Sequence, residues 1–303
     1  MNSLILNKAI FYRNIKDYKF SHKLTSDQKQ EIVSKLQEVL GADYSLLNIS
    51  SLDNKVLNYL NENSLINKNT TTILLNKKQP ICIDLFNGEH VSIVASGENC
   101  FKEANNVADL IQNKISLSYS DEYGYLMSNL INIGAGVKLE CDMCLDAICG
   151  INKLEQVKQN VAMLGYNLNS TNVKNCFRIS TKCSLGFSEE EIYDNFIKTI
   201  NKLQELEVES VKMLDVTNHD EILDNVNRSL AILNVAHMIN IEELTRHLII
   251  LRTGLNLGVI EIDINKINQL QKFVINKTNY VTKEDCIKLA EQVRAILKGE
   301  NNV

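Results

Sequence analysis

The spacing of apolar and polar residues changes character at about residue 215. Before that point, short runs rich in β-branched residues are interleaved with amphipathic stretches. After it, the apolar residues recur at the spacing of an α-helix in every stretch. The pattern predicts two units. The first is an α+β unit over 1–215, with an antiparallel β-sheet flanked by helices, and the second is an all-α unit over 216–303.

Apolar runs bounded by turn residues predict the strands of the first unit. These strands are expected at 70–75, 81–86, 90–95, 138–144 and 176–185, and a further short strand opens the stretch 8–20. Asn87-Gly88 separates two of the runs and is typical of a type I′ hairpin turn. The sheet is therefore expected to contain hairpins.

Helical spacing predicts four helices before residue 215 and four after it. They are expected at 28–40, 53–63, 103–117, 154–164, 221–235, 241–253, 265–273 and 283–297. Ser188 should cap a long helix, because three glutamates follow it in the first turn. The apolar run 248–251 predicts an exposed patch, and with it a dimer formed through the C-terminal helices.

Composition and charge exclude several classes of function. The chain has 303 residues, 45% of them hydrophobic, and a net charge of -5. No global positive field favours nucleic acid or an anionic membrane. The first 20 residues alternate apolar with Asn, Lys and Arg, and no apolar run reaches the roughly 18 residues that span a bilayer. A cytoplasmic protein is expected.

The eight cysteines are expected to be reduced thiols. Cys141-x-x-Cys144 has the spacing of a metal or redox site, but no second pair follows at a suitable distance. Within the strand predicted there, small buried thiols are the better interpretation. His237 and His247 have no matching ligand at helical spacing, so no metal site is expected.

Several motifs follow one another in a recognisable order. They are Asp121-Glu-Tyr-Gly-Tyr-Leu-Met-Ser128, Asn132-Ile-Gly-Ala-Gly-Val-Lys138, Ser184-Leu-Gly-Phe-Ser-Glu-Glu-Glu-Ile192 and Arg252-Thr-Gly-Leu-Asn-Leu-Gly-Val-Ile260. This order resembles the ATP:guanidino phosphotransferases, and within them the bacterial protein arginine kinases. The resemblance covers nearly the whole chain. It implies the guanidino kinase catalytic fold with a small helical C-terminal domain.

The resemblance also implies a reaction, in which the γ-phosphoryl group of Mg-ATP is transferred to a guanidinium group. In the family, arginines clamp the phosphates and two glutamates orient the guanidinium. Glu98 matches one catalytic glutamate of the family. The nucleotide-binding positions fall on Lys8, Lys102, Asn132 and Lys138, and the three lysines replace arginines of the family.

Other family positions have changed further. Ile10 replaces a second arginine of the first strand, and Asn129 stands at the position of a reactive cysteine. The glycine- and acid-rich loop that carries the second glutamate has no counterpart between Asn169 and Val173. Without the resemblance, Glu98 would be a solvated turn carboxylate and the three lysines would be ordinary surface residues.

Three functional hypotheses remain open. The first is a pseudokinase that acts by binding partners, such as an intact relative, a zinc-finger activator, a stress-response repressor or an AAA+ unfoldase. The second is an active protein arginine kinase that uses ATP and Mg²⁺. The third is a receptor for phosphoarginine through the C-terminal helices, where Arg294 matches the first arginine of the "R-x-R" pattern of the family's last helix and Ile296 replaces the second.

Overall fold

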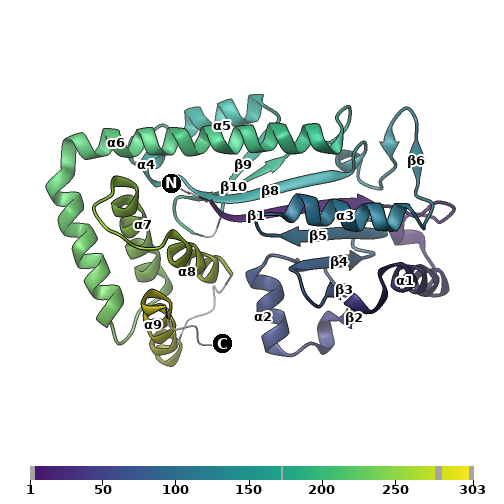
Figure 1. The fold of residues 1–303 in the computed structure, drawn as a ribbon, viewed down its shortest axis with the longest axis horizontal. Coiled ribbons are helices and arrows are strands. Elements are labelled where there is room, and N and C mark those ends of the chain that lie inside the picture. The colour runs from purple at the N-terminus through teal and green to yellow at the C-terminus, as the bar shows by residue number, and fades with distance from the viewer. Residues whose placement is uncertain (1–3, 172, 277–281, 300–303) are drawn as a thin grey trace.

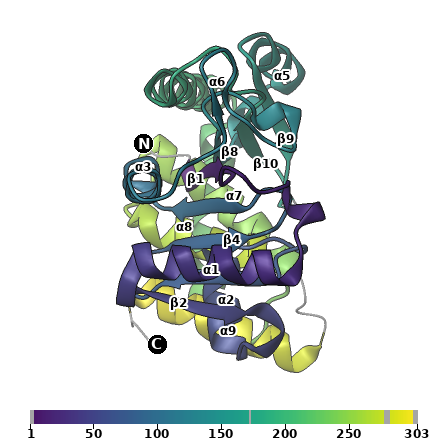
Figure 2. The ribbon, with the colours of Figure 1, turned by 90° about the vertical axis from the view of Figure 1, so that its right-hand side faces the viewer.

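The protein is built around one eight-stranded sheet. The computed structural model describes residues 4–171, 173–276 and 282–299. The sheet order is β2-β3-β4-β5-β1-β8-β10-β9, and every neighbouring pair is antiparallel. A separate two-stranded ribbon pairs β6 with β7. Figure 2 shows the strands in a row, with α5 and α6 at one end and α1 and α2 at the other.

The strands are short, apart from the central β1 and β8. Their bounds are β1 Leu4–Arg13, β2 Tyr44–Asn48, β3 Thr72–Asn76, β4 Ile81–Leu85, β5 Val91–Ser96, β6 Tyr119–Ser120, β7 Gly124–Tyr125, β8 Val137–Cys144, β9 Tyr166–Ser170 and β10 Cys176–Thr181.

Helices lie between the strands and make up the whole C-terminal part. The α-helices are α1 Ser26–Leu40, α2 Asn54–Glu62, α3 Cys100–Gln112, α4 Asp146–Gly150, α5 Leu154–Met163, α6 Glu189–Val235, α7 Ile241–Leu257, α8 Ile264–Asn276 and α9 Lys283–Lys298. Short 3-10 turns occupy Ser21–Lys23, Gly41–Asp43, Ile49–Ser51 and Leu130–Asn132. Within the described residues, no helix is both long and apolar enough to cross a bilayer.

The two faces of the sheet differ in chemistry because alternate residues of a strand point to opposite sides. One face is the main core, where the strands pack against α1, α3, α5 and the first half of α6. Sheet residues of this core include Ala9, Phe11, Ile83, Ile93, Leu139, Cys141 and Ile179. On the opposite face, Ile10, Cys82 and Val94 form a smaller apolar cluster with α2. Beyond that cluster, the opposite face carries charged side chains.

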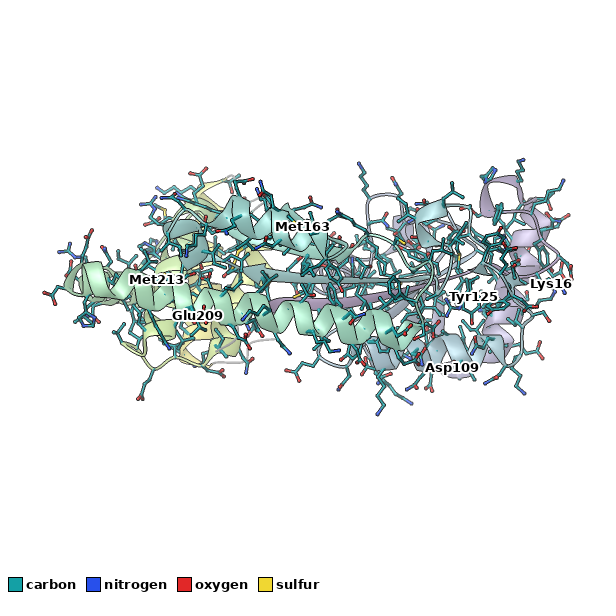
Figure 3. All side chains as sticks on the ribbon, turned by 90° about the horizontal axis from the view of Figure 1, so that it is seen from above. Lys16, Asp109, Tyr125, Met163, Glu209 and Met213 are labelled. Carbon is teal, nitrogen blue, oxygen red and sulfur yellow. A yellow bond between two sulfur atoms is a disulfide. The ribbon has the colours of Figure 1, made fainter. Side chains whose placement is uncertain are left out.

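Helix α6 links the two parts of the chain. It is 47 residues long and begins at Ser188, whose hydroxyl accepts a hydrogen bond from the Glu191 amide, while the Glu191 carboxylate accepts one from the Ser188 amide. It runs over the sheet and turns down beside α7, α8 and α9 (Figure 1). Seen from above, it extends along the molecule, with the exposed Glu209 and Met213 turned outward (Figure 3).

The predicted fold class is confirmed by the antiparallel sheet and by the helical C-terminal part. All eight predicted helices have counterparts. The helix expected at 103–117 is shorter than predicted, since α3 ends at Gln112. The helix expected at 221–235 is the last part of α6. The boundary expected at residue 215 lies inside α6, so no break in secondary structure marks it. That boundary stays a prediction.

The type I′ turn predicted at Asn87-Gly88 was wrong. The hairpin between β4 and β5 exists, but its loop spans 86–90 and the positive φ angles fall on Phe86 and Gly88. A type I′ turn would need a positive φ at Asn87. Its side-chain amide instead donates a hydrogen bond to Asp84 at 2.7 Å.

The cysteine prediction is also corrected in part. Cys144 and Cys176 form a disulfide, because the β8–β10 register places them directly opposite each other. Cys141 is a buried free thiol, as expected.

The apolar run 248–251 does not form an exposed patch. Leu248 and Leu251 are fully buried in the C-terminal core, where Leu270 and Leu289 join them from α8 and α9. The chain therefore covers most of this surface itself, and the expected dimer needs other support.

Candidate functional site

Five charged side chains meet on the face of the sheet opposite the main core. They form the sheet-face cluster, which consists of Lys8, Lys138, Glu140, Asp142 and Arg178. The strand register builds it, because Lys8 on β1 pairs with Glu140 on β8, and Arg178 on β10 pairs with Asp142. Residues of strands far apart in the sequence are thus neighbours in space.

Glu140 is the centre of the cluster. Its Oε2 lies 2.6 Å from Lys8 Nζ, and its Oε1 lies 2.6 Å from Lys138 Nζ. Burial alone would raise the pKa of Glu140, but the two lysine charges and their hydrogen bonds outweigh it and lower the pKa to about 2. The carboxylate is therefore ionised at neutral pH and holds both predicted lysines.

Arg178 completes the cluster from β10. Its Nε and Nη2 donate to the two carboxylate oxygens of Asp142 at 2.6 and 2.7 Å, a bidentate pair. Its Nη1 also lies 3.8 Å from Glu140 Oε2. The hydrogen bonds to Asp142, together with the charges of Asp142 and Glu140, raise the pKa of the Arg178 guanidinium further above its usual range. The cluster therefore contains three cations and two carboxylates, with strong pairing among them.

Glu98 and Lys102 lie outside the cluster. Glu98 is exposed in the turn between β5 and α3, and Lys102 is exposed in the first turn of α3. The turn is next to β1, because the Gly97 amide donates to the Asn7 carbonyl at 2.9 Å. The structure therefore joins Lys8 and Lys138 directly through Glu140, whereas Glu98 and Lys102 stand at the start of α3, which packs on the main-core face of the sheet.

The connection that should carry a second glutamate is short. Residues 171–175 join β9 to β10, and none of them is acidic. The Thr171 amide donates to the Cys176 carbonyl at 2.9 Å and closes the hairpin. No second carboxylate is supplied by this hairpin.

The two remaining predicted residues have structural contacts. The Asn132 carbonyl accepts a hydrogen bond from the Ser184 hydroxyl at 3.3 Å and so joins two motif segments. The Arg294 guanidinium donates to the Ala236 carbonyl at the end of α6. Arg294 therefore binds the α6–α7 connection of its own chain.

Several retained motif residues form a structural network. Arg13 is buried and its guanidinium pairs with Glu189 in the first turn of α6. The guanidinium also donates to the carbonyls of Tyr12 and Ala135, at 2.8 and 3.2 Å, and lies 3.8 Å from the ring centroid of Tyr125. This arginine joins the start of α6 to the central strands.

Asn14 and Glu89 fix the loop that follows the two-stranded ribbon. The buried Glu89 carboxylate accepts from the Asn14 amide at 2.7 Å and from the backbone amides of Ser128 and Asn129, at 2.9 and 3.1 Å. Asn14 also accepts from the His90 amide at 2.8 Å. These motif positions maintain the scaffold.

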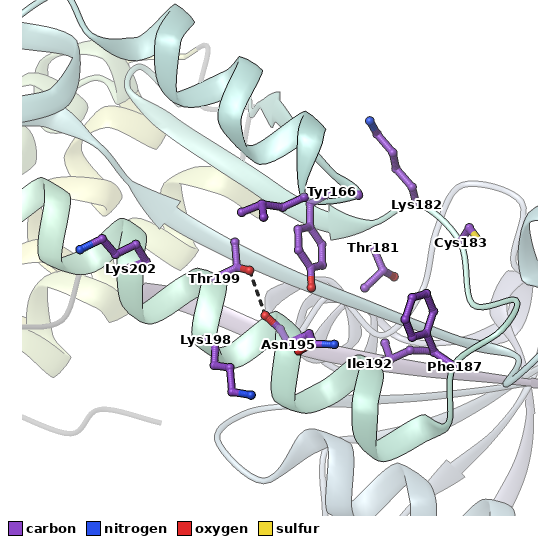
Figure 4. A pocket seen from close by; sticks show the side chains of 12 residues that line it. Tyr166, Thr181, Lys182, Cys183, Phe187, Ile192, Asn195, Lys198, Thr199 and Lys202 are labelled. Atoms are coloured by element: carbon purple, nitrogen blue, oxygen red, sulfur yellow. Dashed lines mark hydrogen bonds between the residues drawn. The ribbon is translucent and has the colours of Figure 1, made fainter.

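One described pocket lies away from this cluster. Its volume is about 510 Å³ and it opens between α6 and the ends of β9 and β10. Its basic residues are Lys182, Lys198 and Lys202, whose side chains point in different directions (Figure 4). The Thr199 hydroxyl is bonded to the Asn195 carbonyl at 2.9 Å. The lysines do not converge on one ligand, and none of the predicted site residues lines this pocket.

The sequence alone did not single out Glu140, Asp142 and Arg178. A signal for the first two was present, since Lys138, Glu140 and Asp142 alternate along a predicted strand and must share one face. The register that places Lys8 and Arg178 against them is tertiary. Among the described residues, no group of three His, Cys, Asp or Glu side chains is placed to hold a metal ion.

Comparisons with known proteins cover the whole chain. The profile of the family described as ATP:guanido phosphotransferase, C-terminal catalytic domain, matches residues 10–210. A second profile, the protein-arginine kinase McsB C-terminal domain, matches residues 219–300. Both matches follow the chain in the order expected from the motifs.

Two curated relatives carry the name protein-arginine kinase. The one from Clostridium perfringens is 27% identical over 99% of this chain and 97% of its own length. The one from Staphylococcus haemolyticus is 25% identical over 94% of this chain and 90% of its own length.

Solved structures share the fold. A lombricine kinase covers 68% of this chain and 67% of its own, with a TM-score of 0.58 and 16% identity. A duplicated taurocyamine kinase from Schistosoma mansoni covers 74% of this chain and 36% of its own, with a TM-score of 0.59 and 13% identity.

Proposed function

The chain belongs to the ATP:guanido phosphotransferase family, in its bacterial protein-arginine kinase branch, and within that branch we propose that it is a pseudokinase that acts by binding partner proteins. One observation carries this proposal. Lys8 and Lys138, which replace clamp arginines, are both bound at 2.6 Å by Glu140. Both ammonium groups are held by this one carboxylate, so they are poor ligands for a triphosphate.

The acceptor side of the site supports the same proposal. Glu98 matches one of the family's two glutamates, and residues 171–175 offer no acid to act with it. One carboxylate cannot both align a guanidinium and hold its second nitrogen. The loss of a single positioning group costs roughly 10²–10³-fold in rate, and such losses are not additive. We therefore expect a large deficit in phosphoryl transfer.

The alternative function is an active protein arginine kinase. The name of the relatives favours it, and it would require ATP and Mg²⁺. The residues present do not fit the phosphates of ATP, because the sheet-face cluster already pairs its cations with carboxylates. We derive no catalytic step from this arrangement.

The deciding experiment is incubation of the full chain with Mg-ATP and an arginine-rich protein, followed by mass spectrometry for phosphoarginine. The pseudokinase proposal predicts no signal above that of a heat-denatured control. A strong signal that disappears in Glu98→Gln would overturn the proposal in favour of the active kinase. A strong signal that is unchanged in Glu98→Gln would indicate a contaminating kinase.

The second half of the proposal is that the protein acts by binding partner proteins. Candidate partners are a second copy or an intact relative bound through the C-terminal helices, a zinc-finger activator, a stress-response repressor and an AAA+ unfoldase. A phosphoarginine receptor is a weaker candidate, because the Arg294 guanidinium is bonded to the Ala236 carbonyl. Light scattering of the chain alone, and with each candidate at micromolar concentration, tests these partners directly. A monomer in every mixture would contradict this half.

A further inference from the structure

The sheet-face cluster contains a carboxylate where its cations could otherwise meet an external anion. Lys8 and Lys138 come from neighbouring strands, and both ammonium groups point at Glu140. Two lysines that converge on one point from two strands form an anion site. In this chain the anion at that point is Glu140.

Solvent can reach the cluster from one side. The side chains of Lys138 and Arg178 are 37% and 34% exposed, whereas those of Lys8 and Glu140 are 13% and 8% exposed. An anion in solution could therefore approach Lys138 and Arg178, but it would meet the Glu140 carboxylate beneath them. Because Glu140 is ionised, it would repel such a ligand.

We propose that Glu140 is a built-in anion that closes an oxyanion site formed by Lys8, Lys138 and Arg178, and that its removal opens this site to polyphosphates. The proposal rests on the pseudokinase function only in that it assumes weak polyphosphate binding by the native chain. It further names Glu140 as the residue responsible for that weak binding and polyphosphates as the ligands that Glu140 excludes.

The charge balance gives the size of the effect. With Glu140 present, three cations face two carboxylates, and without it they face Asp142 alone. A like charge about 5 Å from a bound phosphate, at the effective dielectric constant of about 20 for protein sites, weakens binding on the order of a hundredfold. Freed lysines add to the gain, since each can donate to a phosphate oxygen.

The test is calorimetric titration of tripolyphosphate into the full-length native chain and its Glu140→Gln variant. We expect the variant to bind on the order of a hundredfold more tightly. Mg-ATP in a parallel titration separates the two sources of this chemistry. A gain for both ligands indicates a site for the phosphate chain, and an additional gain for ATP indicates a nucleoside contact.

Matched variants isolate Glu140 from a general change in charge. Asp142→Asn removes a neighbouring carboxylate that is bound to Arg178, so it should give a much smaller gain. Glu140→Asp keeps the charge and should give none. The double variant Lys8→Met, Glu140→Gln should lose most of the gain. An equal gain in Asp142→Asn, or no gain in Glu140→Gln, would overturn the proposal while leaving the pseudokinase function intact.

A measurement on the native chain covers the case in which Glu140→Gln fails to fold. Acetylation of lysines by an N-hydroxysuccinimide ester, read by peptide mass spectrometry, should be slow at Lys8 and unchanged by tripolyphosphate. Protection of Lys8 and Lys138 by tripolyphosphate would show that the native site is already open, and the proposal would be wrong. Phosphoarginine formation by the native chain is a separate outcome, which overturns only the pseudokinase function.

Discussion

Arg13 and Glu189 lie 176 residues apart in the sequence and form an ion pair between β1 and the first turn of α6, in which Arg13 is buried and Glu189 is partly exposed. Removing Arg13 leaves the Glu189 carboxylate and the carbonyls of Tyr12 and Ala135 without their donor, which together costs about 3–5 kcal/mol at roughly 1–3 kcal/mol for each unsatisfied group. Arg13→Met should therefore lower the free energy of unfolding by that amount in urea denaturation.

Glu189→Gln is the matched variant for this pair. It keeps a hydrogen-bond acceptor, and Arg13 keeps the carbonyls of Tyr12 and Ala135. The buried Arg13 charge loses its counter-charge but keeps these acceptors, so we expect a smaller loss, of about 1.5–3 kcal/mol, as for a hydrogen bond to a charged group. Equal losses in the two variants would contradict the idea that the arginine serves several partners at once.

The glycine in the second motif provides a sharper test of the scaffold. A Cβ at Gly134 would lie 2.4 Å from the Ser184 carbonyl oxygen, and φ is +109°. Gly97 has a similar φ of +115° but no atom within 4 Å of its Cβ position. Both alanine variants carry the backbone strain of positive φ, which costs roughly 1–3 kcal/mol, but only Gly134→Ala also forces two chain segments apart.

Gly134→Ala should consequently be insoluble or unfold at a much lower temperature than Gly97→Ala, as measured by circular dichroism. Similar melting temperatures for the two variants would mean that the contact between Gly134 and Ser184 is easily relaxed.

The buried acid Asp146 should make stability depend on pH. It lies where α4 meets α6 and α7, near Glu207 and Arg252. Burial, with the charge of Glu207, raises the pKa of Asp146 to about 7 against the opposing charge of Arg252, and the ordinary value is 3.8. Between about pH 4 and pH 7 the native state therefore keeps a proton that the unfolded state has lost, so the free energy of unfolding falls as pH rises through this window.

Asp146→Asn should remove much of this fall, because the amide stays neutral at every pH. Urea denaturation at several values from pH 4.5 to pH 7.5 measures the slope, and Asp121→Asn, an exposed acid, is the control. A slope that is the same in all three proteins would show that Asp146 titrates as an ordinary carboxyl group.

Because Cys144 and Cys176 are joined by a disulfide, the free energy of unfolding should depend on whether this bond is reduced. Cys144 and Cys176 are 32 residues apart, and closing a loop of that size stabilises by about 3–4 kcal/mol on the chain-entropy model. Dithiothreitol should lower the free energy of unfolding by that amount in the native chain and in Cys183→Ser, but not in Cys144→Ser. Alkylation under denaturing conditions should label the six other cysteines without reductant, and labelling of all eight would argue against the bond.

Local chemistry made much of the fold predictable. The start of α6 at Ser188 was visible because a capping box needs only residues three positions apart. The edge strand β2, Tyr44–Asn48, was missed. Its burial is partial, and a five-residue stretch with only two adjacent leucines gives little periodicity to detect.

The candidate site was less predictable for a physical reason. Lys8 and Lys138 could be proposed from motif positions, but their partner depends on the register between β1 and β8. Register is fixed by packing over the whole sheet, and a shift of one residue would send Glu140 to the core face. The disulfide was missed for the same reason, since Cys144 faces Cys176 only in the observed register.

The continuity of α6 sets a rule for how the chain can vary in length. Ile200 and Leu203 of this helix lie in the main core between the helix and the sheet, while Val226 and Leu233 lie in the C-terminal core. The rotation of one core relative to the other about the axis of α6 is therefore fixed by the number of residues between them. One residue inserted between them would rotate everything that follows by about 100° and advance it by about 1.5 Å. A flexible linker absorbs such changes, but here even seven inserted residues, which restore the phase after about two turns, would move the C-terminal core by about 10.5 Å and break its packing against Ile5, Cys144 and Cys176 of the sheet.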